Sequence, residues 1–356
     1  MIKNDSSDSL KSQVAEAFEN KTPLRITGGE SKSFYGNNVK GEAISTVEHT
    51  GIIEYQPSEL VVTVRSGTKL SDLEAELKSN NQMLAFEPPQ HGESTTIGGV
   101  IACAMSGPRR VAAGSARDFV LGTTIINGKA ERLKFGGQVM KNVAGYDASR
   151  LMVGAQGTLG LLLDMSLKVL PLSEAETTLK ISLNIQQAIP LLRKWIKQGL
   201  PISASSHYKN ILYLRLSSTS SAVEASRKII SHAHENEEID NTYWLDVKNQ
   251  RHAFFNKTKD LWRFSHRTTS ETLNTNEDTF YEWNGALCWI NSSEELHTLA
   301  EKNEANATRY PIHLTNEQNA NHFQPLQRGL LKIHKNLKLA FDPENILNPG
   351  RIYSYL

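Results

Sequence analysis

The most informative stretch of the chain lies near its N-terminus and reads Leu24-Arg25-Ile26-Thr27-Gly28-Gly29-Glu30-Ser31-Lys32. Its apolar start predicts a short strand, and its two glycines predict a tight corner where that strand ends. Glycine is needed where φ is positive or where a ligand must approach the main chain closely. Consecutive backbone N–H groups in such a turn bind anions. A corner of this kind can bind a pyrophosphate, but two glycines alone are equally typical of a surface turn after an edge strand.

Two further glycine corners follow. Thr96-Ile97-Gly98-Gly99 opens a helix of small residues that continues to Ser106-Gly107-Pro108-Arg109-Arg110. Such residues either let a flat ring lie against the main chain or serve close packing of a helix on a sheet. The third corner is Gly154-Ala155-Gln156-Gly157-Thr158-Leu159-Gly160, and a strand follows it. A Rossmann fingerprint instead opens a helix, so we expect no nicotinamide site of that type.

The second half of the chain has a different pattern of elements. The order β-α-β-β-α-β predicts the split βαβ unit of ferredoxin-like folds. A polar loop, two further helices and another strand are expected after it. In this unit we expect strands at 178–183, 202–208, 211–216 and 243–247 and helices at 185–197 and 222–232; beyond it we expect helices at 250–264 and 319–340, a loop at 268–279 and a strand at 283–290.

The composition excludes several classes of protein. A length of 356 residues favours two domains, and a net charge of +1 gives no reason to expect nucleic acid or an anionic membrane as a partner. Cys103 and Cys288 are too few for an iron–sulfur cluster, which usually needs four thiolates, and their isolation indicates a reducing compartment. No segment approaches the roughly 20 apolar residues of a membrane-spanning helix. No His-x-x-His-type cluster is present, so we expect no metal site.

Two more motifs complete the pattern. They are Lys141-Asn142-Val143-Ala144-Gly145-Tyr146-Asp147 and Phe341-Asp342-Pro343-Glu344-Asn345-Ile346-Leu347-Asn348-Pro349-Gly350-Arg351. Taken with the three glycine corners, they resemble the PCMH-type FAD-binding family, which includes vanillyl-alcohol oxidase and D-lactate dehydrogenase. The order and spacing match over nearly the whole chain. Within the family, Glu282-Trp283-x-Gly285-Ala286-Leu287-x-Trp289 and the short second domain look most like the FAD-binding E-type subunit of glycolate oxidase.

The resemblance implies an α+β fold with two domains. A PCMH-type FAD-binding domain of two α/β subdomains would span residues 1–172, and a ferredoxin-like cap domain would span 173–356, its tail 341–356 returning to the flavin. The implied function is that of an FAD-binding subunit of a glycolate (2-hydroxy acid) oxidase or dehydrogenase complex. FAD would be non-covalent, because no histidine or cysteine occupies the positions where relatives attach flavin.

The resemblance also implies partners and a location. The partners would be a larger flavin-binding sister subunit and an iron–sulfur subunit. The protein would be cytoplasmic and would reach the inner face of the membrane only through them. Two alternatives stay open: a non-catalytic electron-relay or assembly subunit whose sister chain oxidises the substrate, or a binding module without cofactor, which the carboxylate of Glu30 in the first corner would favour.

Site residues follow from the resemblance and from the chemistry. Oxidation of a 2-hydroxy acid needs an arginine for the carboxylate and a base near the hydroxyl. Arg263, expected at a helix end, is the candidate for the first role. Glu282 and the histidines His207, His266 and His313 are candidates for the second, although each of these histidines is more typical of a structural residue. The residues expected to bind FAD are Gly28, Gly29, Glu30, Ser31, Lys32, Thr96, Ile97, Gly98, Gly99, Ser106, Gly107, Arg109, Tyr146, Gly154, Gly157, Thr158, Leu159, Gly160 and Asn348.

Overall fold

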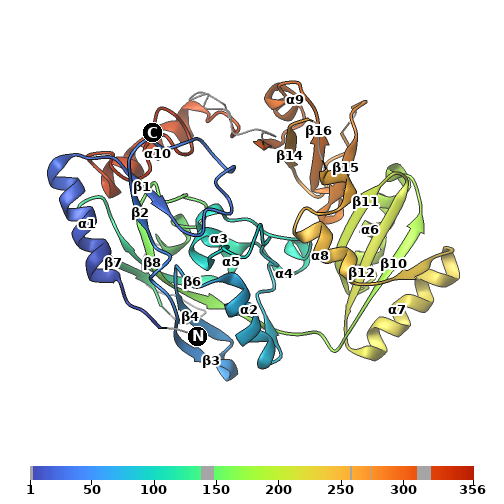
Figure 1. The fold of residues 1–356 in the computed structure, drawn as a ribbon. Coiled ribbons are helices and arrows are strands. Elements are labelled where there is room, and N and C mark those ends of the chain that lie inside the picture. Colours follow the sequence, from blue (N-terminus) through green and yellow to red (C-terminus); the bar gives the residue numbers. More distant parts are fainter. Residues whose placement is uncertain (1–2, 138–147, 257–258, 274, 311–321) are drawn as a thin grey trace.

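The computed structural model describes residues 3–137, 148–256, 259–273, 275–310 and 322–356. The chain forms two lobes that lie side by side (Figure 1). The first lobe holds the N-terminal part, drawn blue to green, together with the red C-terminal helix. The second lobe holds the yellow and orange segments between them.

The first lobe is built around a five-stranded sheet with the strand order β3-β4-β8-β6-β7. Every pairing in it is antiparallel. The central strand β8 is buried along nearly its whole length, as an apolar strand covered on both faces should be. The strands are β3 Ile52–Gln56, β4 Val61–Arg65, β6 Val120–Ile126, β7 Arg132–Gly136 and β8 Leu161–Lys168, and two small pairs join β1 Leu24–Thr27 to β2 Glu42–Ser45 and β5 Gln82–Met83 to β9 Leu170–Pro171.

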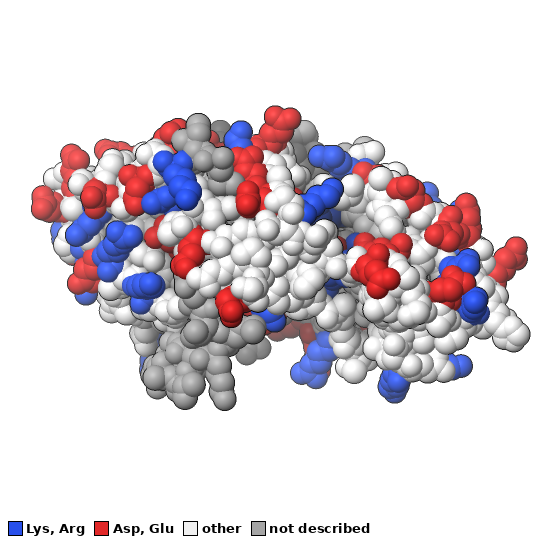
Figure 2. All heavy atoms as spheres, turned by 90° about the horizontal axis from the view of Figure 1, so that it is seen from below, with Lys and Arg blue, Asp and Glu red and all other residues white. Residues whose placement is uncertain are grey.

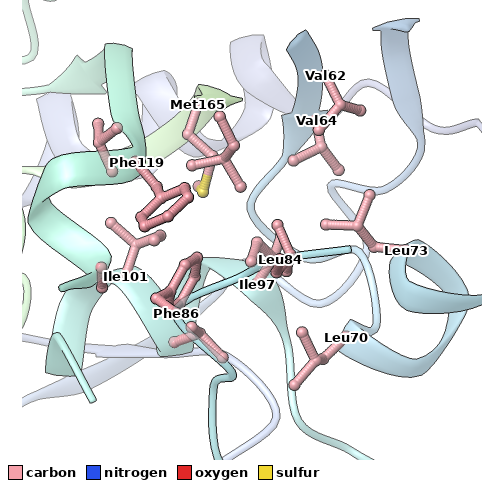
Figure 3. Packing of buried hydrophobic residues seen from close by; sticks show 14 of the residues in the cluster. Val62, Val64, Leu70, Leu73, Leu84, Phe86, Ile97, Ile101, Phe119 and Met165 are labelled. Carbon is pink, nitrogen blue, oxygen red and sulfur yellow. The ribbon is translucent and has the colours of Figure 1, made fainter. Parts of the chain in front are cut away.

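Helices cover this sheet because their apolar residues recur on one face. In α2 (Leu70–Ser79) the buried residues are Leu70, Leu73 and Leu77, at the spacing of a single helical stripe. Figure 3 shows Leu70 and Leu73 of this stripe in one apolar cluster with Val62 and Val64 of β4 and Met165 of β8. The other helices of the lobe are α1 Ser7–Asn20, α3 Ile97–Cys103, α4 Arg110–Ala113 and α5 Ala116–Phe119.

The second lobe contains an eight-stranded sheet in the order β13-β10-β12-β11-β15-β16-β14-β17. Its first four strands, with two helices between them in sequence, form the predicted split βαβ unit, so the ferredoxin-like topology is confirmed. The elements of that unit are β10 Ala175–Ser182, α6 Ile185–Lys197, β11 Ile202–Tyr208, β12 Ile211–Ser218, α7 Ser220–Ala233 and β13 Glu237–Ile239.

One strand of that unit was placed wrongly by the sequence. Residues 243–247 belong to helix α8 (Thr242–Lys248), and the strand is β13, a few residues earlier. Trp244 and Val247 are three positions apart and are both buried in the same aromatic cluster. Their common helical face outweighs the β-propensity of Tyr, Trp and Val, because tertiary packing overrides such a preference.

The predicted helix 250–264 is also wrong. Its described part holds a 3₁₀ turn, Ala253–Phe255, and then strand β14 (Leu261–Ser265), which pairs on both sides. The predicted strand 283–290 begins instead as the turn Trp283–Gly285. The other elements of this half are β15 Thr279–Glu282, β16 Leu287–Asn291, α9 His297–Lys302 and β17 Asn306–Tyr310.

The C-terminal tail returns to the first lobe. Helix α10 runs from Arg328 to Phe341, so it begins later than predicted; residues 311–321 lie outside the described part. Asp342 then accepts the N–H groups of Ile346 and Leu347 at 3.0 and 2.8 Å, and Leu347 bridges to Leu24 of β1. The division into domains 1–172 and 173–356 stays a prediction.

The charges on the surface are mixed. Figure 2 shows lysine and arginine interspersed with aspartate and glutamate over the lower face, without a field of one sign. This agrees with the net charge of +1. The face does not show the clustered positive charge that is typical of a nucleic-acid-binding surface. None of the helices in the described ranges has the length and apolar character needed to cross a bilayer.

Candidate functional site

A cavity of about 980 Å³ opens beside β1. Its wall comes from four segments far apart in the sequence: the corner after β1, the N-terminal end of α3, the loop before β8 and the C-terminal tail. The three predicted glycine corners therefore meet around one space. The residues predicted to bind FAD that line it are Gly28, Gly29, Glu30, Ser31, Lys32, Thr96, Gly98, Gly99, Gly157, Gly160 and Asn348.

The corner after β1 presents four consecutive backbone N–H groups, those of residues 29–32, which we call the amide nest. None of these groups donates to an acceptor in the described part of the chain, and Glu30 adopts a φ of +51°. Main-chain donors without protein partners at a cavity wall are typical of an anion-binding site. The Glu30 carboxylate binds Arg25 at 2.5 Å, so a neighbouring cation offsets its charge.

Close packing explains why glycine stands in this corner. A Cβ on Gly29 would lie 1.5 Å from the carbonyl oxygen of Ser94. The Ser94 hydroxyl donates to the Gly29 carbonyl at 2.6 Å, and the Thr95 hydroxyl donates to that of Ser31 at 2.9 Å. The amide nest is thereby held against the segment that leads into α3.

The start of α3 forms the next part of the wall. Thr96 caps the helix by accepting the Gly99 N–H at 3.2 Å, and a Cβ on Gly98 would lie 2.6 Å from the side chain of Ser66. Ser66 also lines the cavity, and its buried hydroxyl has no hydrogen-bond partner among the described residues. Leaving a buried hydroxyl unpaired costs free energy, so Ser66 offers the cavity a polar group that a ligand can satisfy.

Lys32 supplies a cation to the same wall. The residue is only 6% exposed and lines the cavity, and it has no ion pair within the described ranges. Burial lowers the pKa of its ammonium group, an effect that the nearby Cys103 opposes. A buried cation without a counter-charge is unfavourable. Lys32 therefore indicates that the cavity takes an anionic group.

The C-terminal tail closes the cavity through two side chains. Asn348 accepts the Ile26 N–H and donates to the Gln156 carbonyl, both at 2.7 Å. Arg351 donates to Gln156 Oε1 at 3.2 Å and to the Tyr35 carbonyl at 2.8 Å. The tail thus joins β1, the loop after the amide nest and the loop before β8.

Two catalytic candidates lie in the second lobe, at its junction with the first. Arg263 is in strand β14, not at the predicted helix end, and its guanidinium carbon is 5.0 Å from the centre of the Trp283 ring. Glu282 ends β15, is buried, and accepts the Trp289 Nε1–H at 2.7 Å. Burial raises the pKa of Glu282 to about 7, although the Trp289 hydrogen bond and Arg263 oppose the shift. The structure therefore brings Arg263 and Glu282 together.

The candidate histidines are placed differently. The ring of His207 is hydrogen-bonded to the Leu183 carbonyl at 2.8 Å, and that of His266 to the Arg267 carbonyl at 3.2 Å. Burial lowers the pKa of both imidazoles. Main-chain oxygens hold both rings, as they hold structural histidines. His313 lies outside the described residues.

Two tyrosines connect Arg263 with the cavity. The rings of Tyr35 and Tyr310 have centres 5.5 Å apart. Burial raises the pKa of Tyr35 to about 12, and both Arg263 and Cys103 lie near enough to influence it. The pKa of Tyr310 is raised by burial and is influenced by the same two residues. Because Cys103 lines the cavity, the cavity borders the cluster that contains Arg263.

Comparison with known proteins shows the family to which the chain belongs. A family model described as an FAD binding domain matches residues 2–136. The glycolate oxidase subunit GlcE of Escherichia coli (strain K12) is 41% identical over 355 residues, which cover 99% of each chain. The chain belongs to the PCMH-type FAD-binding family. The predictions of this family, of FAD as the cofactor and of an FAD-dependent oxidoreductase are confirmed.

Other matches extend the comparison. The D-lactate dehydrogenase of Anaerostipes hadrus is 32% identical over 185 residues, which are 51% of this chain but 38% of that protein. The chain therefore matches well under half the length of that relative. The structure of p-cresol methylhydroxylase with substrate bound superposes with a TM-score of 0.73 at 13% identity, covering 99% of this chain and 88% of that one. The predicted α+β fold of the PCMH-type family is confirmed.

The residues of the cavity fit FAD. The amide nest and Lys32 supply main-chain donors and a positive charge, which are the groups that a pyrophosphate needs. The Ser66 hydroxyl, which has no partner in the part of the chain that the structure describes, adds a polar group to the same wall. Gly98 and Gly157 contribute only main chain to the cavity wall.

Arg109 corrects one prediction. It was assigned to the cofactor, but its side chain is 8% exposed and pairs with Glu87 and Glu176. Arg215 of β12 binds the same Glu87 at 2.8 Å. We call Glu87, Arg109, Arg215 and Glu176 the inter-lobe ion cluster, because Glu87 and Arg109 come from the first lobe and the other two from the second. The side chain of Arg109 is engaged in these ion pairs and does not line the cavity.

Other predicted contacts also lie away from the cavity wall. Ser106 accepts the Ala116 N–H at 3.0 Å, and the Gly107 carbonyl accepts the Trp283 Nε1–H at 3.0 Å. These residues serve packing, which was the alternative reading of small residues in this stretch. Of the predicted FAD contacts, Ile97, Ser106, Gly107, Arg109, Gly154, Thr158 and Leu159 do not line the cavity, and Tyr146 lies outside the described residues.

Several residues of the wall were missed. Thr46 directly follows β2 and Ser66 directly follows β4. A polar residue at the end of a predicted strand was therefore the sequence signal that could have identified them as wall residues. Gln156 and Arg351 stand inside motifs that were recognised, but the hydrogen bond between them spans 195 positions. No local pattern reports such a contact.

Proposed function

We propose that this chain is the FAD-binding subunit of a glycolate-type 2-hydroxy acid oxidoreductase complex. The observation that carries the proposal is the amide nest, whose four main-chain donors line a cavity and have no acceptor among the described residues. The chain also matches GlcE over 99% of its length. GlcE is named as a subunit of glycolate oxidase. GlcD of Bacillus subtilis, 29% identical over 176 residues, is named as another such subunit.

The cavity would hold FAD without a covalent bond. In this proposal the amide nest and Lys32 bind the pyrophosphate, and the start of α3 with Ser66 binds further along the cofactor. Asn348 and Arg351 keep the surrounding loops in place. Bound FAD supplies the hydride acceptor, which protein side chains cannot provide.

Arg263 and Glu282 would act on the substrate. The planar guanidinium of Arg263 suits a carboxylate, to which it can donate two parallel hydrogen bonds. Glu282, with a pKa of about 7, can accept the proton of the substrate hydroxyl near neutral pH. Its burial against Trp289 keeps water away from that carboxylate.

The proposal includes partner chains. A larger flavin-binding subunit related to GlcD and an iron–sulfur subunit would complete the complex. Cys103 and Cys288 are both free, and two thiols do not make a four-thiolate cluster site, so such a cluster would sit on another chain. We place the subunit in the cytoplasm and, through these partners only, at the inner face of the membrane.

A second function keeps the fold but moves the reaction to a partner. The chain would then be an electron-relay or assembly subunit. The alignments support this alternative, because they cover only 38% of the D-lactate dehydrogenase and 37% of the Bacillus GlcD. The longer relatives contain segments for which this chain has no counterpart in those alignments.

Anaerobic flavin spectroscopy on the purified subunit tests both functions. We expect a yellow protein whose flavin absorbance bleaches when glycolate or D-lactate is added. A yellow protein that neither acid bleaches favours the relay subunit. A folded protein that contains no flavin and takes up none from added FAD contradicts the proposal.

A further inference from the structure

A second arginine stands on the same ring as Arg263. Arg110, the first residue of α4, has its guanidinium carbon 4.4 Å from the centre of the Trp283 ring, and Arg263 is at 5.0 Å. Trp283 is 2% exposed and is fixed by its hydrogen bond to the Gly107 carbonyl. Two cations, one from each lobe, therefore meet at one buried aromatic ring.

These two arginines differ from the others at the lobe junction. Arg215 is neutralised by Glu87, whereas neither Arg110 nor Arg263 forms an ion pair or a side-chain hydrogen bond with any residue in the described ranges. Burial and then the charge of Arg263 lower the pKa of Arg110, while Asp118 opposes the shift. Like charges held together in a half-buried site favour the binding of an anion.

We propose that Arg110 and Arg263 form a binding site for the carboxylate groups of a small carboxylic acid, and that Trp283 positions both guanidinium groups. This inference rests on the proposed function, because the 2-hydroxy acid substrate would occupy the site. Stacking on an indole ring leaves the N–H edges of a guanidinium free to donate. A carboxylate can then accept two parallel hydrogen bonds from such an edge.

The arrangement also predicts a ligand preference. A monocarboxylate can engage one guanidinium edge fully, whereas a small dicarboxylate has a carboxylate for each. Oxalate, which has no hydroxyl to oxidise, should therefore bind more tightly than acetate. Glu282 and Arg263 both lie against Trp289, so a 2-hydroxy acid held by the arginines would have a proton acceptor within the same cluster.

Isothermal titration calorimetry with oxalate tests the pair in the FAD-containing protein. We expect Arg110→Met and Arg263→Met each to weaken oxalate binding by about 10- to 100-fold, the range for a lost hydrogen-bonded charge pair. Arg110→Lys keeps the positive charge but loses the planar guanidinium that can donate two parallel hydrogen bonds. Its affinity for oxalate should therefore lie between those of the wild type and Arg110→Met. Arg117→Met is the matched control, since this exposed arginine of α5 belongs to the same stretch, and its affinity should stay unchanged.

Equal oxalate affinity in the wild type and Arg110→Met would overturn the inference, as would an FAD-containing wild type that binds no oxalate. If Arg110→Met fails to fold, Arg110→Lys decides in the same way. Flavin absorbance is measured on each sample. A folded protein that binds oxalate through Arg110 but contains no FAD would contradict the proposed function and support the arginine pair.

Discussion

The α-carbon of Gly29 lies against the carbonyl oxygen of Ser94, and a Cβ on Gly29 would stand 1.5 Å from that oxygen. Gly29→Ala must therefore push the amide nest away from the segment before α3. We expect the FAD affinity to fall by about tenfold or more, which is at least 1.4 kcal/mol. The ratio of flavin to protein absorbance after gel filtration measures it. Gly329→Ala in α10, where no atom lies within 4 Å of the new Cβ, should leave the ratio unchanged.

Replacing Lys32 should change binding and stability in opposite directions. Lys32→Met removes a buried cation that has no ion pair in the described part of the chain, so the FAD-free protein should unfold at a higher temperature. The same change should weaken FAD binding by about tenfold or more, because a charge-assisted contact is lost. Thermal melts with and without FAD measure both effects, and Lys197→Gln on the exposed side of α6 is the control. Weaker binding without higher apo stability would contradict this account of Lys32.

The inter-lobe ion cluster should carry a large share of the contact between the lobes. Burial acts to raise the pKa of Glu87, but Arg215 and Arg109 hold it below its ordinary value. Glu87→Gln leaves the buried guanidinium of Arg215 without its carboxylate, while Arg109 keeps Glu176, and we expect a loss of about 3 to 5 kcal/mol. Urea denaturation followed by fluorescence measures this loss. Glu224→Gln breaks an exposed pair on α7 and should change the midpoint little.

Glu282 should make the stability depend on pH. Its pKa rises from 4.5 to about 7 on folding, so the folded state binds the proton more tightly than the unfolded state. Its contribution is complete below pH 4.5, falls as the pH rises from 4.5 to 7, and stays constant above that. The total change is about 3 kcal/mol.

Glu282→Gln removes this titration while keeping an acceptor for Trp289. The variant should therefore gain stability relative to the wild type between pH 5 and pH 8. Denaturation free energies of both proteins at these two pH values measure the difference. A difference between them that does not vary with pH would show that the carboxyl of Glu282 keeps its ordinary pKa.

Local signals explain what the sequence predicted well. Gly28 and Gly29 directly follow a strand, and the first turn of the helix after Thr96 contains Gly98 and Gly99; both features are set by neighbouring residues. The ferredoxin-like order also followed from short-range periodicity in α6 and α7. The errors at 243–247 and 250–264 arose where aromatic residues pack in a cluster whose members come from distant segments. Propensity cannot report such packing.

Side-chain roles depended even more on distant contacts. Arg109 and Arg110 are neighbours in the sequence, yet one is neutralised by Glu87 and the other stands on Trp283. The hydrogen bond that fixes Trp283 crosses 176 positions to Gly107. Composition alone cannot distinguish these two arginines, because the difference lies in what the fold brings to each.

The contact between Ile26 and Asn348 joins residues 322 positions apart. Synthesis proceeds at about 5 to 20 residues per second. The amide nest is therefore made tens of seconds before the tail that completes the cavity wall. Until then the chain contains the amide nest but lacks the part of the wall that the tail supplies. The cavity wall described here is complete only after residues as late as Arg351 have been added.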